Sequence, residues 1–395
     1  MTKVLVLNSG SSSIKFQLFQ MPEETILASG IIDRIGEKIS TFNYELGDFA
    51  SAEKIAVADH KVGLERVTQL LLDNDKGVLQ SPEEVAIIGH RVVHGGSFFS
   101  DATKIDNAVK NKIKSLFSLA PLHNPANLLG IEVAEVIFPK ALQVAVFDTA
   151  FFQTLPQKVY QFAIDQKFLD ENGIRVYGAH GTSHKFVSDQ TAEFLGKMPE
   201  KLITAHLGNG CSMTAIKNGK SVDHSMGLTP LEGLVMGTRS GTIDPSVIFY
   251  LIEELGYSAK EVNTLLNKKS GMLGLTGASD LRDIQQRAEA GDASCKLALE
   301  LNIYRIKKYI GAYAASLNGL DTLVFTAGIG ENSAFLRKMV CQNMDYLGIK
   351  LDEIANDKRD KGIRSIAAED ASVEILIVPT NEELEIARQA YGLTS

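Results

Sequence analysis

Two matching turns indicate how this chain folds: Leu7-Asn8-Ser9-Gly10-Ser11-Ser12 and, two hundred residues later, Leu207-Gly208-Asn209-Gly210-Cys211-Ser212. Each turn follows an apolar, strand-like run and precedes another one. Glycine lets the backbone of such a turn approach a ligand closely, and the turn's N–H groups can face an anion. The repeated pattern of strand, glycine turn and strand therefore predicts two related lobes, each offering N–H groups to a phosphate. A chance similarity between two small-residue turns is the alternative.

Strand-like runs alternate with helical patterns along the chain, which is typical of an α/β protein. A hairpin is expected from Val4–Leu7 and Ile14–Phe19 around the first turn. Further strands are expected at Val85–Gly89, Val144–Phe147, Leu202–Leu207, Thr214–Ile216, Leu323–Thr326 and Val373–Val378. Long helices are expected at Pro245–Glu254, Cys295–Leu317 and Asn381–Tyr391. The boundary between the two lobes is expected just after Asp148.

Composition excludes several classes of protein. The 395 residues predict two or three domains, and 40 basic against 48 acidic residues give a net charge of −8 with no basic block, which disfavours a general nucleic-acid binder. No apolar run approaches the roughly 18 residues of a membrane helix, and the first residues do not resemble a signal peptide. Three widely spaced cysteines argue against a disulfide framework. We expect a soluble protein of the reducing cytoplasm.

Three glycine-containing segments at strand ends are candidate anion-binding loops. Asn8–Lys15 lacks the Gly-Lys-Ser/Thr ending of a Walker A loop, yet Lys15 can return toward an anion across the hairpin. His206–Gly210 is a second such turn. Gly328–Asn332 follows an expected strand and precedes a helical run near Ser333, which predicts a loop at a helix N-terminus. Each segment alone is equally compatible with a plain polar turn.

Two arginines lie in glycine-rich surroundings: Arg91 in His90-Arg91-Val92-Val93-His94-Gly95-Gly96 and Arg239 in Gly237-Thr238-Arg239-Ser240-Gly241. A planar guanidinium held by such a loop suits bidentate capture of a carboxylate or a phosphate. A surface arginine paired with a nearby acid is the alternative for each.

His180 and His184 have the four-residue spacing of a helical zinc pair. Gly181 interrupts that helix and the Glu of His-Glu-x-x-His is missing, so zinc is disfavoured. We expect Thr182 or Ser183 to cap a helix that runs from His184. His180 would then point from the preceding loop and donate to developing negative charge, unless it is a structural histidine.

Three oxygen-bearing side chains are candidate magnesium ligands. Asp148 ends an expected strand, where α/β proteins place functional groups. Thr380 and Glu383 fit a capping box, which leaves Glu382 as the better metal ligand. Asn8, Asp148 and Glu382 would supply the oxygen contacts that magnesium prefers, several of them through water.

Nine motifs, in one order from end to end, resemble those of the acetate kinase family. They are Asn-Ser-Gly-Ser-Ser-Ser-x-Lys at 8–15, His-Arg-Val-Val-His-Gly-Gly at 90–96, Ala-Pro-Leu-His-Asn-Pro at 120–125, Val-Phe-Asp-Thr-Ala-Phe at 146–151, Tyr-Gly-x-His-Gly-Thr-Ser-His at 177–184, His-Leu-Gly-Asn-Gly-Cys-Ser at 206–212, Met-Gly-Thr-Arg-Ser-Gly at 236–241, Gly-Ile-Gly-Glu-Asn at 328–332 and Thr-Asn-Glu-Glu at 380–383. Single motifs are weak, whereas the ordered set is highly specific.

The resemblance implies a two-lobed α/β fold of the actin/Hsp70/sugar-kinase (ribonuclease H-like) type. A duplicated mixed sheet would be flanked by helices, with the active site in the interlobe cleft. The lobes would be residues 1–150 and 151–382, with the C-terminal helix 383–395 packing back on the first. It implies a cytoplasmic homodimer that reversibly phosphorylates acetate to acetyl phosphate with ATP/ADP and Mg²⁺, for which Mn²⁺ can substitute. Neither a nucleic acid nor a membrane is expected as a partner.

The resemblance also implies roles for residues at matching positions. Asp148, His180 and Arg239 would be catalytic, and Asn8 and Glu382 would contact the metal. Arg91 would bind the acyl substrate, whose methyl group Val93, Leu122 and Pro230 would enclose. The nucleotide would be held by Lys15, His206, Leu207, Gly208, Asn209, Gly210, Asp280, Leu281, Arg282, Gly328, Ile329, Gly330, Glu331 and Asn332.

One position departs from the family pattern. Residue 179 is Ala, where relatives often carry Phe beside the acyl pocket. One methylene in an apolar pocket is worth only about 1–3 kcal/mol, so a kinase for propionate or butyrate is the nearest alternative. An ATP-driven conformational machine or filament protein is an alternative from another class, since the fold also serves such roles. A noncatalytic regulator is disfavoured, because no expected catalytic position is replaced.

Overall fold

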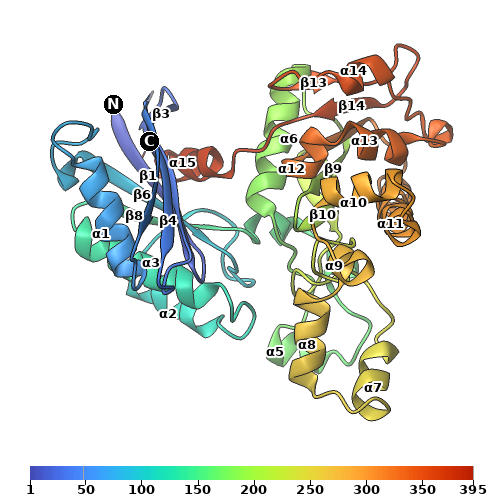
Figure 1. The fold of residues 1–395 in the computed structure, drawn as a ribbon, viewed down its shortest axis with the longest axis horizontal. Helices are drawn as coiled ribbons and strands as arrows, with labels where there is room; N and C mark the ends of the chain where they lie inside the picture. The colour runs from blue at the N-terminus through green and yellow to red at the C-terminus, as the bar shows by residue number, and fades with distance from the viewer. Residues whose placement is uncertain (48, 395) are drawn as a thin grey trace. The chain divides into compact units, whose positions relative to one another are not determined.

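The computed structural model describes residues 1–47 and 49–394, which form two compact units (Figure 1). Unit 1 comprises Met1–Phe151 and Asn381–Ser395, and unit 2 comprises Phe152–Thr380. Each unit is built on one mixed β-sheet, so each is described by itself.

Unit 1 contains an eight-stranded sheet in the order β5-β4-β3-β2-β1-β6-β8-β7. Its strands are β1 (Thr2–Ser9), β2 (Ser13–Met21), β3 (Thr25–Asp33), β4 (Ser40–Leu46), β5 (Phe49–Ile55), β6 (Val85–Val92), β7 (Thr103–Lys104) and β8 (Leu142–Phe147). The predicted hairpin is confirmed, because β1 and β2 pair antiparallel with Asn8 opposite Lys15. On the other side of β1, strands β6 and β8 run parallel to it and to each other.

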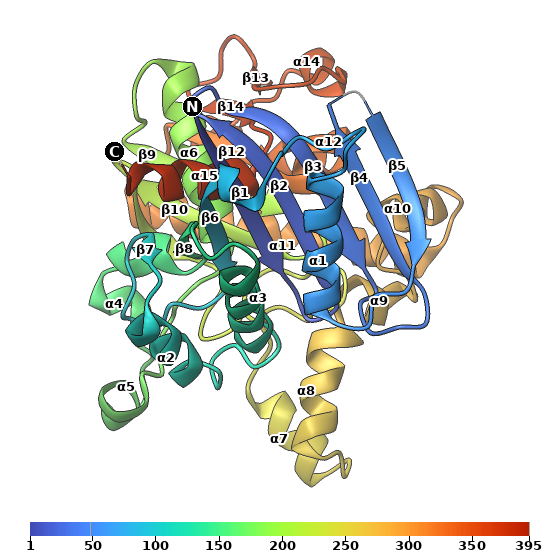
Figure 2. The same ribbon diagram turned by 90° about the vertical axis from the view of Figure 1, so that its left-hand side faces the viewer.

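Helices cover both faces of this sheet (Figure 2). They are α1 (His60–Leu71), α2 (Asn107–Ser115), α3 (Asn124–Ile137) and α15 (Glu382–Gly392). Successive side chains of a strand point to opposite faces. Leu5 and Leu7 accordingly share one core with α1 and α3, whereas Val4 and Val6 share another with Ile386 and its neighbours in α15. Contact between α15 and the sheet is close, since a Cβ on Gly89 would lie 2.7 Å from Ile386.

Unit 2 contains a six-stranded sheet in the order β11-β10-β9-β12-β14-β13. Its strands are β9 (Lys201–Leu207), β10 (Cys211–Lys217), β11 (Lys220–His224), β12 (Thr322–Thr326), β13 (Arg364–Ser365) and β14 (Glu374–Ile377). Its helices are α4 (Gln157–Tyr160), α5 (Lys167–Asn172), α6 (Gly181–Leu195), α7 (Ser246–Glu253), α8 (Ala259–Lys268), α9 (Gly271–Thr276), α10 (Leu281–Glu289), α11 (Ala293–Leu317), α12 (Ala327–Asn332), α13 (Ala334–Cys341) and α14 (Glu353–Asp357). The 25-residue α11 contributes buried side chains to the main core of this unit.

Six strands of each sheet follow the same scheme. The order β3-β2-β1-β6-β8-β7 matches β11-β10-β9-β12-β14-β13. The first three strands of each set pair antiparallel, the next two join in parallel, and the edge strand is antiparallel. The two matching turns of the sequence connect β1 to β2 and β9 to β10, at the same place in both sheets. The predicted duplicated mixed sheet is thus confirmed.

All the strands and long helices expected from the sequence are present, with ends shifted by a few residues. The expected loop at Gly328–Asn332 is wrong, because these residues form the short helix α12 directly after β12. All three cysteines are buried free thiols, as expected. Within the described residues, no helix combines the length and apolar character needed to cross a bilayer.

Candidate functional site

In unit 1, the ends of two parallel strands bring Arg91 and Asp148 together. Arg91 is the penultimate residue of β6, and Asp148 follows β8 directly, with its N–H donating to the carbonyl of Val92 (2.9 Å). The Arg91 Nη2 donates to Asp148 Oδ2 at 2.9 Å, and its Nε lies 3.5 Å from Glu382 Oε2 at the start of α15. Arg91, Asp148 and Glu382 are here named the arginine–carboxylate cluster.

Charge and burial oppose each other in the arginine–carboxylate cluster. Burial disfavours the charged guanidinium, but the carboxylates of Asp148, Glu382 and Glu383 outweigh it and raise the pKa of Arg91. Burial raises the pKa of Glu382 to about 7, against the effect of Arg91 and with a further increase from Asp148 and Glu383. The cluster therefore holds more negative than positive charge, an arrangement that an additional cation would stabilise.

Glu383 forms an ion pair with Lys15, and the predicted capping box of Thr380 and Glu383 is wrong. The Lys15 Nζ lies 2.6 Å from Glu383 Oε1. The cap of α15 is Asn381, whose Oδ1 accepts from the N–H of Leu384 (3.0 Å). Thr380 is not available as a cap, since its hydroxyl lies 2.8 Å from that of Ser183. Glu383 thus holds Lys15 in place instead of closing the helix.

Two asparagines of α3 position the segment after β6, a role that sequence reasoning missed. Asn127 Oδ1 accepts from the N–H of Val93 (3.0 Å), and its Nδ2 donates to the carbonyl of Ser9 (2.7 Å). Asn124 bonds both the N–H and the carbonyl of His94 (3.0 and 2.9 Å). The only sequence signal that could have indicated this role is the motif at 120–125, because it contains Asn124. These contacts link the end of β1, with Asn8, to the segment that carries Val93.

The residues expected to enclose a methyl group are distributed over both units. Val93 is partly buried and Leu122 is exposed, both in unit 1, whereas Pro230 belongs to unit 2. The Pro230 carbonyl accepts from Arg239 Nη1 at 2.8 Å.

In unit 2, His180 and Arg239 reach the same glycine turn. A Cβ on Gly210 would lie 3.3 Å from Cε1 and Nε2 of His180 and 3.4 Å from Nη2 of Arg239. Glycine at this position therefore leaves room for both side chains. Burial lowers the pKa of Arg239, although a guanidinium stays protonated at any physiological pH. The structure thus brings two of the three predicted catalytic residues to the turn between β9 and β10.

The backbone at His180 differs from the prediction. Helix α6 begins at Gly181, and His180 itself is its N-cap residue with φ of +61°, in the left-handed region. Neither Thr182 nor Ser183 caps the helix; the Ser183 hydroxyl contacts His206 Nδ1 (2.8 Å) and Thr380. The left-handed residue turns the chain sharply, so that the His180 ring stacks on the ring of His206 with centroids 4.3 Å apart.

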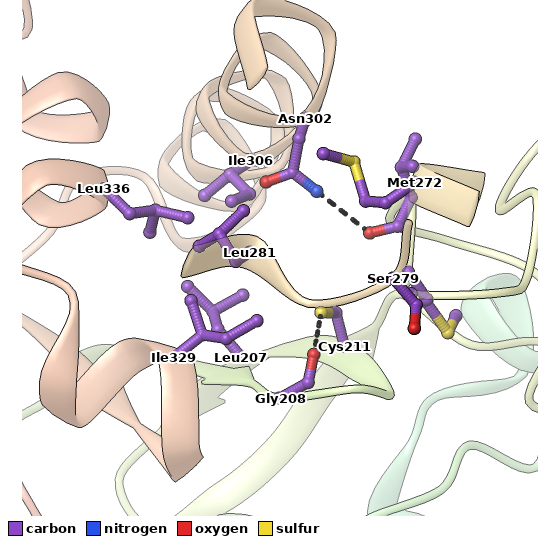
Figure 3. A pocket seen from close by; sticks show the side chains of 13 residues that line it. Leu207, Gly208, Cys211, Met272, Ser279, Leu281, Asn302, Ile306, Ile329 and Leu336 are labelled. Carbon is purple, nitrogen blue, oxygen red and sulfur yellow. Dashed lines mark hydrogen bonds between the residues drawn. The ribbon is translucent and has the colours of Figure 1, made fainter. Parts of the chain in front are cut away.

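Several predicted nucleotide-binding residues line one pocket of unit 2 (Figure 3). Leu207, Gly208, Leu281 and Ile329 contribute to its wall together with Met272, Ile306 and Leu336. Asp280 caps α10 by accepting from the N–H of Arg282 (2.8 Å), and its other oxygen pairs with that guanidinium (2.6 Å). Asn209 packs against Gly237, where a Cβ would lie 2.1 Å from Asn209 Oδ1. The wall of this pocket is largely apolar.

Gly328, Gly330, Glu331 and Asn332 lie in α12. The Glu331 carboxylate accepts from the N–H of Thr380 (3.1 Å), and burial raises its pKa. Asn332 Nδ2 donates to the carbonyl of Gly328 (2.9 Å), and a Cβ on Gly328 would meet open space.

Arg337, which sequence reasoning missed, holds the C-terminal end of α12. This buried guanidinium donates to the carbonyls of Gly330 (2.8 Å), Glu331 (2.9 Å) and Asn356 (2.9 Å), and to Asn356 Oδ1 (2.7 Å). Its partners come from two helices, α12 and α14, so no single motif points to it.

Replacing Arg337 by methionine is expected to destabilise the protein by at least about 3 kcal/mol, because several buried acceptors lose their donor. That loss corresponds to a melting temperature lowered by roughly 6–12 °C in a domain of this size. Thermal unfolding followed by circular dichroism measures the shift. Lys338→Met on the same helix is the matched control, since it removes only an exposed ion pair with Glu353. Equal shifts for the two variants would contradict the role of Arg337.

Two of the three predicted magnesium ligands, Asp148 and Glu382, lie against the same arginine in unit 1. No group of three or more His, Cys, Asp or Glu side chains suited to a metal occurs in residues 1–47 and 49–394. Magnesium does not need one, because it commonly binds one or two carboxylates, waters and substrate phosphates. Asp148 and Glu382 supply two carboxylates held against Arg91, and Asn8 lies at the end of β1.

Comparisons with known proteins agree along the whole chain. A model described as the acetokinase family matches residues 3–388. The acetate kinase of Flavobacterium johnsoniae is 56% identical over 391 residues, 99% of both chains. The crystal structure of Porphyromonas gingivalis acetate kinase has a TM-score of 0.95 at 43% identity and full coverage of both chains. A propionate kinase from Francisella tularensis has a TM-score of 0.93 at 43% identity, covering 99% of this chain and 100% of that one. The chain belongs to the acetokinase family.

Proposed function

We propose that this protein is a kinase that transfers the γ-phosphoryl group of ATP to acetate, reversibly, forming acetyl phosphate. The observation that carries the proposal is the approach of His180 and Arg239 to the Gly210 turn, in a chain 56% identical to an acetate kinase. Membership of the acetokinase family supports ATP and ADP as co-substrates.

Phosphoryl transfer to acetate requires cationic groups that reduce charge repulsion, and it does not require a general base. Acetate has a pKa near that of an Asp or Glu side chain, roughly 4, so it is already an anionic nucleophile at neutral pH. Its difficulty is the approach to a polyanion, since two unit charges about 4 Å apart repel by about 4 kcal/mol at an effective dielectric near 20. Arg91 and Lys15 from unit 1 and Arg239 from unit 2 would offset this repulsion. The reaction therefore requires several cationic side chains around the two anions.

Each residue set then has a role. Arg239 and His180 donate to the oxygens of the phosphoryl group in flight, where charge spreads. Arg91 binds the carboxylate, and Val93, Leu122 and Pro230 contact the methyl group. The glycine turn at 206–210, the Asp280–Arg282 segment and α12 hold the nucleotide. Asp148 carries the wrong charge to touch the phosphoryl group, so it orients Arg91 and metal-bound water.

We assign Asn8, Asp148 and Glu382 to a Mg²⁺ ion, for which Mn²⁺ can substitute as a hard cation with oxygen ligands. When bound, the ion would supply positive charge that offsets the negative charge of the phosphate groups. The excess of carboxylates over cations around Arg91 supports this assignment.

The magnesium concentration for half-maximal activity is expected to fall by about tenfold between pH 6 and pH 8, because a ligand must be deprotonated and the pKa of Glu382 lies at about 7. The direction of this change follows from the raised pKa of Glu382. Protonation of Glu382 stabilises the metal-free folded protein at low pH, and this stabilisation is lost as the pH rises through about 7. Magnesium titrations of the initial rate at each pH measure the effect.

Glu382→Gln should raise the magnesium requirement and remove its pH dependence. Glu383→Gln is the neighbouring comparison and should change the magnesium requirement less, because Glu383 pairs with Lys15. Equal effects of the two substitutions would contradict the assignment of Glu382.

The decisive test of the function is trapping of the acyl phosphate by hydroxylamine, with ATP, magnesium and acetate, propionate or butyrate in turn. We expect acetate to give the highest kcat/KM. Propionate is the second candidate, because Ala179 stands where a larger residue is frequent and one solved neighbour is a propionate kinase. ATP hydrolysis without any acyl hydroxamate would instead indicate a conformational ATPase.

We further infer a cytoplasmic homodimer. ATP and ADP are cytoplasmic co-substrates, which supports that location. Helix α7 and the residues after it expose Val247, Phe249, Tyr250 and Leu255 (42%, 59%, 60% and 55% of each side chain), an apolar surface that a second copy would cover. Light scattering coupled to gel filtration measures the mass, and Tyr250→Glu should yield monomers.

A further inference from the structure

A buried chain of hydrogen bonds leads from strand β9 to the ring of His180. Thr204 Oγ1 lies 2.7 Å from His184 Nδ1, and His184 Nε2 lies 2.8 Å from Ser212 Oγ. The same Ser212 oxygen lies 2.8 Å from Nδ1 of His180. Thr204, His184 and Ser212 are all fully buried in unit 2. Of these four residues only His180 has a role in the proposed reaction, and no role has yet been given to Thr204, His184 and Ser212.

The number of available protons limits the directions in which these hydrogen bonds can run. Burial lowers the pKa of His184 well below its usual range, with a further decrease from His224 and His206, so the ring is neutral and carries one N–H. Ser212 has a single hydroxyl proton for its two ring partners. All four hydrogen-bonding groups can then be satisfied in only two ways, which differ in the direction of every bond.

We propose that the bonds run from Thr204 through His184 and Ser212 to His180, and that this chain places the proton of neutral His180 on Nε2. Thr204 donates to His184 Nδ1, His184 Nε2–H donates to Ser212, and Ser212 donates to His180 Nδ1. Ser212 and His184 are thereby positioning residues. In the opposite direction Nδ1 of His180 would carry a proton, and a neutral ring would then have no proton on Nε2 to donate.

Geometry supports the first direction. Nε2 of His180 is the nitrogen that approaches the Gly210 turn, where Nη2 of Arg239 also arrives. A neutral imidazole stabilises negative charge there only if Nε2 carries the proton. Stacking on His206 opposes an exchange of the two ring nitrogens, because the rotation would pass through an unstacked orientation. The inference rests on the proposed role of His180 as a donor.

A neighbouring pair in the same cluster provides a matched control. Thr214, two residues after Ser212 on β10, lies with Oγ1 2.9 Å from Nδ1 of His224. The other nitrogen of His224 accepts from the backbone N–H of Ala179 (3.2 Å), which fixes its tautomer independently of His180. Thr214→Val therefore removes a buried hydroxyl–histidine bond that does not lead to His180.

The experiment is nitrogen NMR of the full-length protein labelled with ¹⁵N in its histidines, with His180 assigned by comparison with His180→Gln. Protonated and unprotonated ring nitrogens have widely separated shifts, so the tautomer is read directly and without turnover. We expect the Nε2–H form in the unsubstituted protein and in Thr214→Val, and its loss in Ser212→Ala. An Nδ1–H form in the unsubstituted protein, or an unchanged tautomer in Ser212→Ala, would overturn the proposal.

Kinetics give the second readout. Ser212→Ala should lower kcat by roughly 10- to 100-fold, the usual effect of removing a group that orients a functional histidine, and leave the KM for ATP nearly unchanged. Ser212→Thr keeps the hydroxyl and should recover most of the rate. Absence of acyl phosphate formation by the unsubstituted protein would instead defeat the proposed function, whereas the tautomer measurement would still test the hydrogen-bond chain.

Discussion

Arg239→Ala should lower kcat at least about a hundredfold, the range measured when one donor to a developing oxyanion is removed. Nη1 of Arg239 is anchored on the carbonyl of Pro230, which directs Nη2 to the Gly210 turn beside His180. A guanidinium so placed has its main effect when charge builds up on the transferred phosphoryl group. The dissociation constant for ATP should therefore change by no more than about threefold.

Two measurements separate these effects. Steady-state kinetics give kcat, and calorimetric titration with ATP gives the affinity. Arg287→Ala is the control, because this arginine of unit 2 pairs with Asp292 on the surface. A variant with weakened ATP binding and an unaltered kcat would show that Arg239 serves only to hold the nucleotide.

Arg91→Leu should reduce both stability and the use of acetate. Asp148, which is 1% exposed, would lose its partner at 2.9 Å, and Glu382 would lose its nearest cation. Removing one member of a buried pair typically costs about 3–5 kcal/mol, or a melting temperature lower by roughly 6–20 °C. Loss of a charge-assisted bond to the substrate carboxylate should lower kcat/KM for acetate by roughly 10- to 150-fold.

A second substitution distinguishes the two losses. Asp148→Asn in the Arg91→Leu background removes the buried negative charge that faced the guanidinium, and it should restore much of the melting temperature but not the use of acetate. Arg66→Leu, which breaks an exposed pair with Glu53 in the same unit, should change neither quantity appreciably. If Arg91→Leu leaves kcat/KM for acetate intact, then Arg91 supports the carboxylates and does not bind the substrate.

Much of the fold could be predicted because its signals are local. The apolar runs around Asn8-Ser9-Gly10 and Gly208-Asn209-Gly210 are strands in both units, and the glycine turns connect them. Arg91 and Asp148 could each be placed at a strand end in advance, because each directly follows a run that reads as a buried strand. Their contact follows from the parallel pairing of β6 with β8.

The errors have a common cause, since each concerned a group whose conformation depends on contacts outside its own sequence motif. Gly328–Asn332 reads as a loop because glycines disfavour helices, but Arg337 binds the carbonyls at the end of α12 and stabilises it. Thr380 reads as a cap, but its hydroxyl is taken by Ser183, 197 residues away. The left-handed backbone of His180 is likewise favoured by its surroundings and not by its residue type.

Helix α15 has a consequence for how the protein is made. Its Ile386, Ala387 and Ala390 complete one core of unit 1, and it carries Glu382 and Glu383, yet the ribosome synthesises it only after the whole of unit 2. The first 151 residues therefore leave the ribosome long before the helix that covers their sheet. A nascent chain in this state exposes Val4, Val6 and Ile87 to the solvent and is vulnerable to aggregation. A frameshift after residue 380 would make that exposure permanent.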